Sequence, residues 1–478
     1  MNRGMRAAWL ISSSTFFLII TIFAYSMVGR GFDPSAVKAY SVIAALLVVF
    51  QAFNNVKVRG IRSWIQIDLA FLLMYFFVHF WIWIALSYDM VSIDGWPPEY
   101  SKHVNRAVAL SLMGMAAFIF GYNLKPGITS EEQVELLGRQ HWKTIGNLIF
   151  FGGAALTLAY AFYFGAAAFD GNYTGSAVGN LATRTIYMLS GIFVKLGIAI
   201  VLVAHSDGKA YIPKCKIALA TLGAILLMHL VLGDRSEFVN TLAVALFAYS
   251  SYYRRISLPV MVAGLVAGAF LMSAVQISRT ASERSLAEIG KAVTSSDASI
   301  TSGLNNIAAS GGVMLAAVTA VPKEHDYFGG DLKILELVGI IPFGRSLFLG
   351  DSLDVEYNSS STFLTWYILG PNATAGAGTT IVADLYVDFG PTGVVIGLIL
   401  LGYIANMVRR YTSNSGSIMV AVIFCYFAGL VAMLPRFTYL MIIRGLIWPV
   451  LLLWPLKKLL VPTPRTQLPV GQAASRAR

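Results

Sequence analysis

The chain has 478 residues, of which 57% are hydrophobic and only 12% are charged, and its mean hydropathy is +0.68. Soluble domains carry about 25% charged residues, so this composition excludes a soluble enzyme and a disordered chain. The two cysteines, Cys215 and Cys425, are far apart, which excludes a disulfide scaffold and a cysteine-based zinc site. The apolar runs are continuous rather than alternating, which disfavours a β-barrel.

Apolar runs long enough to cross a bilayer as helices recur along the whole chain. They predict an all-α polytopic membrane protein with about 12 transmembrane helices. The predicted spans are 7–28, 37–53, 65–87, 104–121, 145–168, 185–204, 217–232, 236–253, 258–277, 379–407, 417–434 and 437–460.

The positive charges orient these spans. With the N-terminus in the cytoplasm, most of the 35 lysines and arginines fall in inside segments, and each such segment carries at least two of them. This asymmetry follows the positive-inside rule and predicts that both termini are cytoplasmic. The net charge of +11 therefore reflects membrane topology, and nucleic acid is not an expected partner.

The spans divide the chain into four parts. Residues 1–277 form a bundle of the first nine spans, residues 278–378 form one large outer loop, and residues 379–460 form the last three spans. Within the loop, the apolar runs Ile307–Val321 and Leu332–Ile341 predict short helices on, or dipping into, the outer membrane interface. A loop this long is more often functional than a simple connection. The proline-rich residues 461–478 are expected to be a disordered cytoplasmic tail.

Arg235 lies in a tight turn, Gly233-Asp-Arg-Ser-Glu237, between two predicted spans. Asp234 and Glu237 have the spacing of a helix capping box. An arginine in the first turn of a helix is unfavourable unless an anion is bound there. Arg235 therefore either binds a ligand such as a phosphate group or pairs with a local acid.

Other cations at the outer side, or within spans, also need partners. Arg436 and Arg444 are eight residues apart and share a helix face if the last helix begins near Arg436. Arg444 falls inside a span, where a charge usually faces a partner or a wet cavity. Lys195 either pairs with a buried acid or extends to the interface. Three further arginines are candidate substrate ligands: Arg279, Arg345 and Arg184. Alternatively, Arg279 simply flanks a span at the lipid interface.

Asp384 and Asp388 are four residues apart and share one face of a predicted helix. They could orient sugar hydroxyls, or one of them could take a proton from an attacking hydroxyl. Alternatively, they face water or pair with the arginines. The six histidines have no metal-binding spacing, and His229 is expected to make an interhelical hydrogen bond. No nucleotide-binding or metal-binding motif occurs, so no cofactor is expected.

These motifs, in this order, resemble the bacterial O-antigen polymerase family, which includes enterobacterial common antigen polymerase. The resemblance covers residues 220–450, and no histidine stands near Asn372–Gly378, where some members carry one. The segments that carry it are Gly233–Phe238, Pro342–Ser346, Ala375–Gly393 and the pair Arg436 and Arg444.

The resemblance implies a multi-span, GT-C-like glycosyltransferase that works without a metal in the bacterial inner membrane, with its active site facing the periplasm. Its substrates would be undecaprenyl-diphosphate-linked oligosaccharides, and a separate protein would regulate chain length. Fixed arginines would stabilise the diphosphate leaving group. Asp384, Asp388 or Glu237 would assist the incoming hydroxyl.

Two other functions remain open. An O-antigen ligase uses similar chemistry with a different acceptor. A lipid-oligosaccharide flippase or transporter would usually have two related halves and polar groups near the middle of the membrane. Here the unusual charges lie on the outer side and the halves differ, which favours the polymerase.

Overall fold

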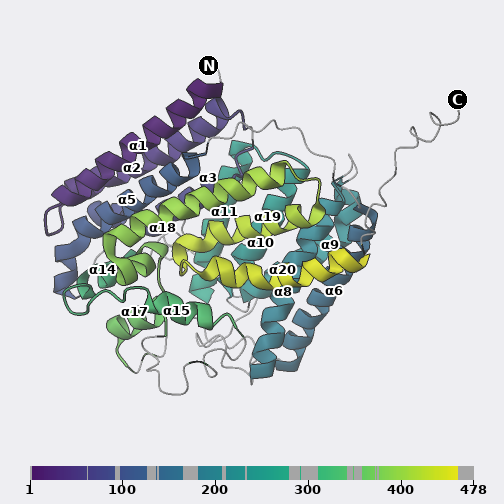
Figure 1. The fold of residues 1–478 in the computed structure, drawn as a ribbon. Coiled ribbons are helices and arrows are strands. Elements are labelled where there is room, and N and C mark those ends of the chain that lie inside the picture. Colours follow the sequence, from purple (N-terminus) through teal and green to yellow (C-terminus); the bar gives the residue numbers. More distant parts are fainter. Residues whose placement is uncertain are drawn as a thin grey trace, which may run out of the picture.

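The computed structural model shows a bundle of long helices with three shorter helices gathered at one end (Figure 1). No strand occurs among the residues that it describes. These are residues 3–61, 63–91, 97–125, 136, 139–164, 181–206, 211–231, 234–278, 291, 311–341, 348, 358–371, 373 and 376–460. The predicted tail at 461–478 and the Pro342–Ser346 motif lie outside these residues.

Every predicted span coincides with a helix or a pair of helices, which confirms the all-α class. The span predicted at 65–87 is divided at Phe80 into two helices. The helices are α1 (Arg3–Met27), α2 (Pro34–Phe53), α3 (Ile67–His79), α4 (Trp81–Ser87), α5 (Val104–Asn123), α6 (Arg139–Phe164), α8 (Leu181–Ala204), α9 (Tyr211–Val231), α10 (Arg235–Tyr252), α11 (Leu258–Ser278), α18 (Ile381–Ser413), α19 (Ile418–Met433) and α20 (Met441–Leu460).

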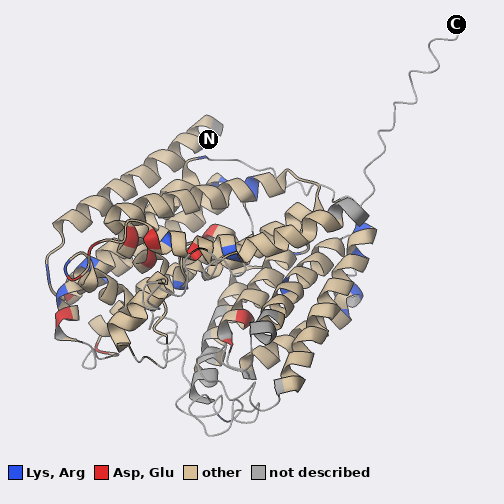
Figure 2. Cartoon of the chain, turned by 60° about the horizontal axis from the view of Figure 1, so that its bottom comes forward, with Lys and Arg blue, Asp and Glu red and all other residues tan. Residues whose placement is uncertain are grey.

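Within the described ranges, 8 helices are long and apolar enough to cross a membrane by length and composition. This agrees with a polytopic membrane protein, while the total of twelve crossings stays a prediction. Charged residues are confined to a few places in the bundle (Figure 2).

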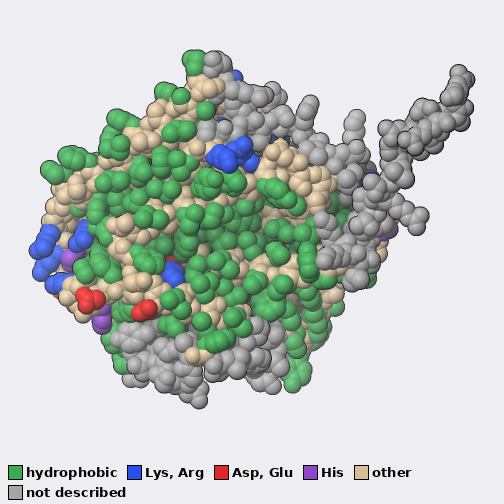
Figure 3. Space-filling view, in the orientation of Figure 1, with side chains coloured by type: hydrophobic (Ala, Val, Ile, Leu, Met, Phe, Trp, Pro, Cys, Tyr) green, Lys and Arg blue, Asp and Glu red, His purple; other side chains and the backbone are tan. Residues whose placement is uncertain are grey.

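The outer flank of the bundle is apolar, as lipid contact requires. On α1, Phe16, Ile19 and Phe23 are 59%, 61% and 65% exposed and recur at helical spacing. A similar stripe follows α2 at Val42 and Leu46. Figure 3 shows broad hydrophobic surface on one face of the molecule. In a soluble protein such stripes would be buried, so their exposure indicates that lipid covers them.

Helices α5 and α18 approach each other unusually closely. A Cβ atom added to Gly402 would overlap the backbone carbonyl of Phe118, and one added to Gly121 would overlap that of Ile399. Small residues of this kind let membrane helices pack backbone to backbone, where dispersion contacts drive association. The α5–α18 contact thus depends on both glycines.

Replacing Gly402 with leucine is expected to lower the thermal unfolding midpoint of the detergent-solubilised protein, because the side chain must push α5 away. Overpacking of this kind typically costs about 1–3 kcal/mol. Gly152→Leu is the matched control, since a Cβ there has no neighbour within 4 Å. Equal midpoints for the two variants would contradict the close contact.

α18 is broken near its start. Gly390 has φ +66° and ψ −160°, and Pro391 follows it, so one helix ends at this point and another begins. The predicted single span at 379–407 therefore contains two helices. At 1.5 Å per residue, the part after Pro391 is about 33 Å long, enough to cross a hydrocarbon core of about 30 Å alone.

The break in α18 is closed by the loop that follows α14. The backbone N–H of Phe328 donates to Val387 O at 3.1 Å, and that of Gly329 donates to Asp388 O at 2.9 Å. Gly329 and Gly330 have φ of +63° and +106°, which glycine adopts without strain. This turn leads directly into the first residue of α15 and fixes α15 against α18.

Three short helices from the predicted loop lie together beside the start of α18 (Figure 1). Their bounds are Gly311–Ala320 for α14, Asp331–Val338 for α15 and Ser360–Leu369 for α17. α14 and α15 fall in the two predicted runs. The side chains of α14 from Val313 to Ala320 are all buried, and α14 contacts α5, α17 and α18. It thus packs against protein rather than lying on a membrane surface.

Candidate functional site

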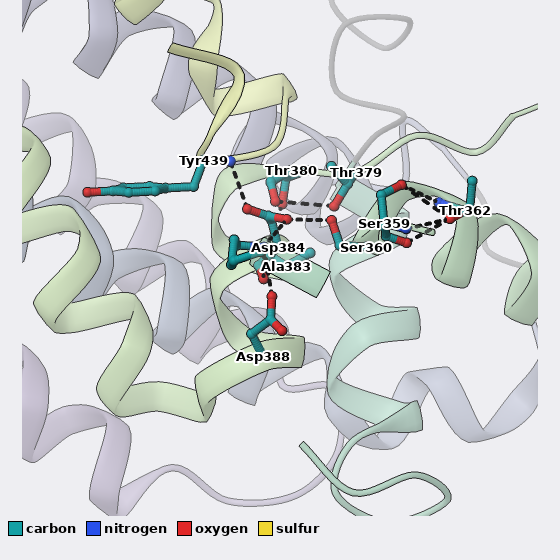
Figure 4. A network of polar contacts seen from close by, with 10 residues as sticks. Ser359, Ser360, Thr362, Thr379, Thr380, Ala383, Asp384, Asp388 and Tyr439 are labelled. Atoms are coloured by element: carbon teal, nitrogen blue, oxygen red, sulfur yellow. Dashed lines mark hydrogen bonds and ion pairs between the residues drawn. The ribbon is translucent and has the colours of Figure 1, made fainter. Parts of the chain in front are cut away.

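Asp384 and Asp388 lie on the short first part of α18, and both are fully buried. Thr380 caps this helix by accepting a hydrogen bond from the N–H of Ala383 at 3.2 Å. The two carboxylates share one helix face, as the sequence predicts, because they are four residues apart. In Figure 4, Asp388 lies one turn further along the helix than Asp384.

Lys333 of α15 binds both carboxylates. Its Nζ lies 2.6 Å from Asp384 Oδ1 and 2.7 Å from Asp388 Oδ2. It also donates to the backbone oxygen of Asp384 at 3.3 Å. Both aspartates therefore pair with this lysine, a partner that the sequence does not predict.

Asp384 is held by two further donors. Ser360 Oγ, at the start of α17, donates to Oδ1 at 2.5 Å, and the backbone N–H of Tyr439 donates to Oδ2 at 2.7 Å. Figure 4 shows Asp384 between these two residues. One carboxylate therefore joins α15, α17, α18 and the segment before α20. We call the residues gathered here the acid–lysine cluster: Lys333, Glu336, Ser360, Asp384, Asp388 and Tyr439.

Asp388 is less constrained. Lys333 and the backbone of Leu332 approach its carboxylate, but neither contact has full hydrogen-bond geometry. A buried carboxylate with free lone pairs can accept a proton or a substrate hydroxyl, so Asp388 is the better suited of the two aspartates to proton transfer.

Glu336, one turn after Lys333 on α15, is the third acid of the cluster. Burial, followed by the negative charge of Asp384, raises the pKa of Glu336 to about 8. Burial alone would lower the pKa of Lys333, but Asp384, Glu336 and Asp388 raise it above its usual value. Near neutral pH, the cluster therefore holds a protonated Glu336, a charged Lys333 and two aspartates.

The raised pKa predicts a pH-dependent stability. The pKa of glutamate in an unfolded chain is about 4.3. Between that pH and about pH 8, the unfolded chain has lost a proton that folded Glu336 keeps. Stability should fall as pH rises through this window, by at most about 1.4 kcal/mol per pH unit. Thermal unfolding at pH 6 and pH 8 should show a smaller decrease for Glu336→Gln than for wild type. Glu324→Gln, at an exposed position, is the control and should show the wild-type decrease. If Glu336→Gln shows the same decrease as wild type, the raised pKa of Glu336 is contradicted.

A second polar cluster surrounds the start of α10. Lys195 Nζ binds Glu237 Oε2 at 2.5 Å, so Lys195 pairs with an acid, which was one of its two predicted roles. Asp234 accepts a hydrogen bond from the N–H of Glu237 at 3.1 Å, the first half of the predicted capping box. The second half is replaced by the ion pair, because the Glu237 side chain extends to Lys195.

Tyr187 of α8 connects this cluster to α9. Its hydroxyl donates to Asp234 Oδ2 at 2.8 Å and lies 3.3 Å from His229 Nδ1, which confirms the interhelical role predicted for His229. The two acids that flank Arg235 are thus bound by Tyr187 and Lys195. Arg235 itself is the first residue of α10, and its side chain lies outside the described part of the structure.

The other predicted arginines have different outcomes. Arg436 is half-buried in a short 3-10 turn, Leu434–Arg436, and α20 begins only at Met441, so the continuous helix assumed for Arg436 and Arg444 is absent. Arg444 is exposed. Arg184 is in α8, but its side chain is not described, and Arg279 and Arg345 lie outside the described residues.

Lys333, Glu336, Ser360 and Tyr439 were not predicted as site residues. The only signal in the sequence was a lysine and a glutamate three residues apart in the apolar run Leu332–Ile341. Such a pair is one helical turn apart and needs a common partner when the run is buried.

A comparison with protein families matches residues 9–461 to the O-antigen polysaccharide polymerase Wzy family. The match extends well beyond the residues 220–450 that carry the motifs. No curated protein and no solved structure matches the chain. With nearly the whole chain covered, the protein belongs to the O-antigen polysaccharide polymerase Wzy family, whose members are membrane enzymes that polymerise O-antigen repeat units.

Proposed function

We propose that this polymerase transfers a glycan chain from undecaprenyl diphosphate to the terminal sugar of a second lipid-linked repeat unit. The bond between the anomeric carbon and the diphosphate oxygen breaks, and the acceptor hydroxyl oxygen bonds to that carbon. The lipid diphosphate leaves with the electron pair, and the acceptor proton passes to a carboxylate. The acid–lysine cluster is the observation that carries this proposal.

Within the cluster, Asp388 would take the acceptor proton and Asp384 would hold the surrounding elements in place. Asp384 already receives bonds from Lys333, Ser360 and Tyr439, whereas Asp388 keeps free lone pairs. Glu237, which was another candidate base, is bound by Lys195. General-base catalysis of this kind contributes about 10²–10⁴-fold.

The proposal includes metal-independent catalysis. Lys333 lies between Asp384 and Asp388, where its ammonium group supplies the positive charge that a bridging divalent ion would otherwise bring. Arg436 precedes Tyr439 by three residues, which puts a guanidinium group on the segment that bonds Asp384. Arg436 would stabilise the departing diphosphate together with the other candidate arginines: Arg235, Arg444, Arg279, Arg345 and Arg184.

The active site would face the periplasm of the inner membrane, with both termini in the cytoplasm. Segments predicted to be cytoplasmic meet at one end of the bundle, where Arg6 donates to Val58 O and Arg410 donates to Lys125 O. The cluster lies before Pro391, at the other end of α18. A separate chain-length regulator remains a proposed partner, on the family resemblance.

Elongation of a purified lipid-linked repeat unit by the purified protein, with a chelator present, tests this function. A ladder of longer lipid-linked products is expected, and it should be unchanged by the chelator. Transfer of glycan only to a lipid A–core acceptor would overturn the proposal in favour of a ligase. Loss of elongation on chelation would overturn its metal-independent part.

A further inference from the structure

A third polar region, also buried, lies at the opposite end of α18 from the acid–lysine cluster. Arg409 is 19 residues after Gly390, about 28 Å along the helix by its rise per residue. Here the ends of α2, α3, α5 and α18 meet. Arg59, Asp68 and Tyr122 are almost completely buried, at 2%, 0% and 0% exposed, and Arg409 is 8% exposed.

Two guanidinium groups lie close to one aromatic ring in this region. The Cζ atom of Arg59 is 4.6 Å from the centroid of the Tyr122 ring, and that of Arg409 is 5.9 Å from it. The ring accounts for part of their stabilisation through cation–π attraction. Two like charges this close to one ring repel each other, so the arrangement favours a negative charge nearby.

The one described carboxylate in the network does not pair with either arginine. Asp68 Oδ2 accepts hydrogen bonds from Gln51 Nε2 at 2.6 Å and from Asn55 Nδ2 at 2.8 Å. Arg59 instead donates to neutral oxygens, at 2.5 Å to Asn123 Oδ1 and at 3.3 Å to the backbone oxygen of Tyr122. The two arginines therefore carry one more positive charge than Asp68 can balance.

Several donors in this region have no acceptor. Arg59 Nε and Arg409 Nε and Nη2 are buried and make no hydrogen bond among the residues that the structure describes. Unpaired buried donors are unfavourable, the more so on a charged group. A tetrahedral oxyanion accepts several hydrogen bonds at once, and planar guanidinium groups bind it with two parallel donors.

We propose that Arg59, Tyr122 and Arg409 form a binding site for a phosphate group, separate from the catalytic cluster. The positive charge of the two buried arginines attracts anions, whereas the neighbouring Arg410 is half-buried and donates to the backbone oxygen of Lys125. The phosphate would come either from the headgroup of an anionic lipid or from a soluble phosphate compound. Basic pockets between helix ends bind lipid headgroups on the cytoplasmic side, where this region is predicted to lie.

Thermal unfolding of the purified full-length protein in neutral detergent tests this site. Phosphatidylglycerol and inorganic phosphate are added separately, with phosphatidylcholine and sodium chloride at matched concentrations as references. Binding to the folded state raises the unfolding midpoint. We expect phosphatidylglycerol, inorganic phosphate or both to raise the wild-type midpoint by several degrees over the references.

Arg409→Met should lose this response while Arg410→Met, its matched neighbour, keeps it. Without an anion, Arg409→Met should unfold at a midpoint equal to or above that of wild type, because an uncompensated buried charge is removed. If Arg409→Met does not accumulate, Arg409→Lys serves instead, since it keeps the charge but loses the planar fork, and its response should fall by about half or more.

The source of the bound phosphate group is identified by which addition raises the unfolding midpoint. A response to phosphatidylglycerol alone assigns the site to a lipid headgroup, and a response to inorganic phosphate assigns it to a soluble phosphate. No rise with either addition, or the same rise in wild type and Arg409→Met, overturns the site.

Discussion

Asp388→Asn is expected to abolish long-chain polymer while leaving the protein folded in the membrane. Asparagine has nearly the same volume as aspartate and can still accept a hydrogen bond from Lys333, but it cannot take up a proton. If Asp388 is the general base, elongation should slow by about 10²–10⁴-fold. The measurement is the initial rate of elongation of a defined lipid-linked repeat unit, together with the thermal unfolding midpoint.

Asp331→Asn is the matched control for this substitution. Asp331 is two residues before Lys333, at the start of α15, and its side chain is exposed. It should elongate at the wild-type rate. A wild-type rate in Asp388→Asn would exclude Asp388 as the base, and proton transfer would then have to involve another acid of the cluster.

Lys333→Met should have the largest effect on stability. The substitution leaves Asp384 and Asp388 buried without their counter-charge, and removal of one partner from a buried ion pair costs about 3–5 kcal/mol. It also removes the side-chain contacts that hold α15 against α18, so polymer should be lost. Thermal unfolding and elongation of the purified variant measure the two effects.

A second substitution separates charge balance from catalysis. In the Lys333→Met background, Asp384→Asn removes the unpaired charge and should recover part of the lost stability without restoring polymer. Lys323→Met, at an exposed lysine of the same loop, should change neither property. If Lys333→Met unfolds at the wild-type midpoint, the ion pairs with the two aspartates do not stabilise the loop.

The sequence predicted what depends on local periodicity and on burial. The helices followed from continuous apolar runs, and the common face of Asp384 and Asp388 followed from their spacing. The interhelical contact of His229 was also expected, because a polar group inside an apolar helix needs a partner, and pairing with a buried acid was one of the two roles predicted for Lys195.

The partners themselves could not be predicted. Lys333 is 51 residues from Asp384, and it reaches the carboxylate only because the turn at Gly329 and Gly330 bonds the broken end of the first part of α18. The break at Gly390 was missed because 379–407 was interpreted as one apolar span, although the dipeptide Gly390-Pro391 is a local signal for a helix break. Arg59 and Arg409, which form no ion pair among the described residues, come together through helix ends from four separate segments, a long-range arrangement that no local pattern reports.

The break at Gly390 and Pro391 has a consequence for how substrate could reach the carboxylates. Because Pro391 has no N–H and Gly390 leaves the helical conformation, Val387 and Asp388 offer their carbonyl oxygens to Phe328 and Gly329. The same loop delivers Lys333 onto both aspartates. Admission of a sugar to Asp388 by displacement of α15 would therefore exchange these two backbone hydrogen bonds and two ion pairs for contacts with the glycan. Such an exchange would couple entry of the acceptor to exposure of the base.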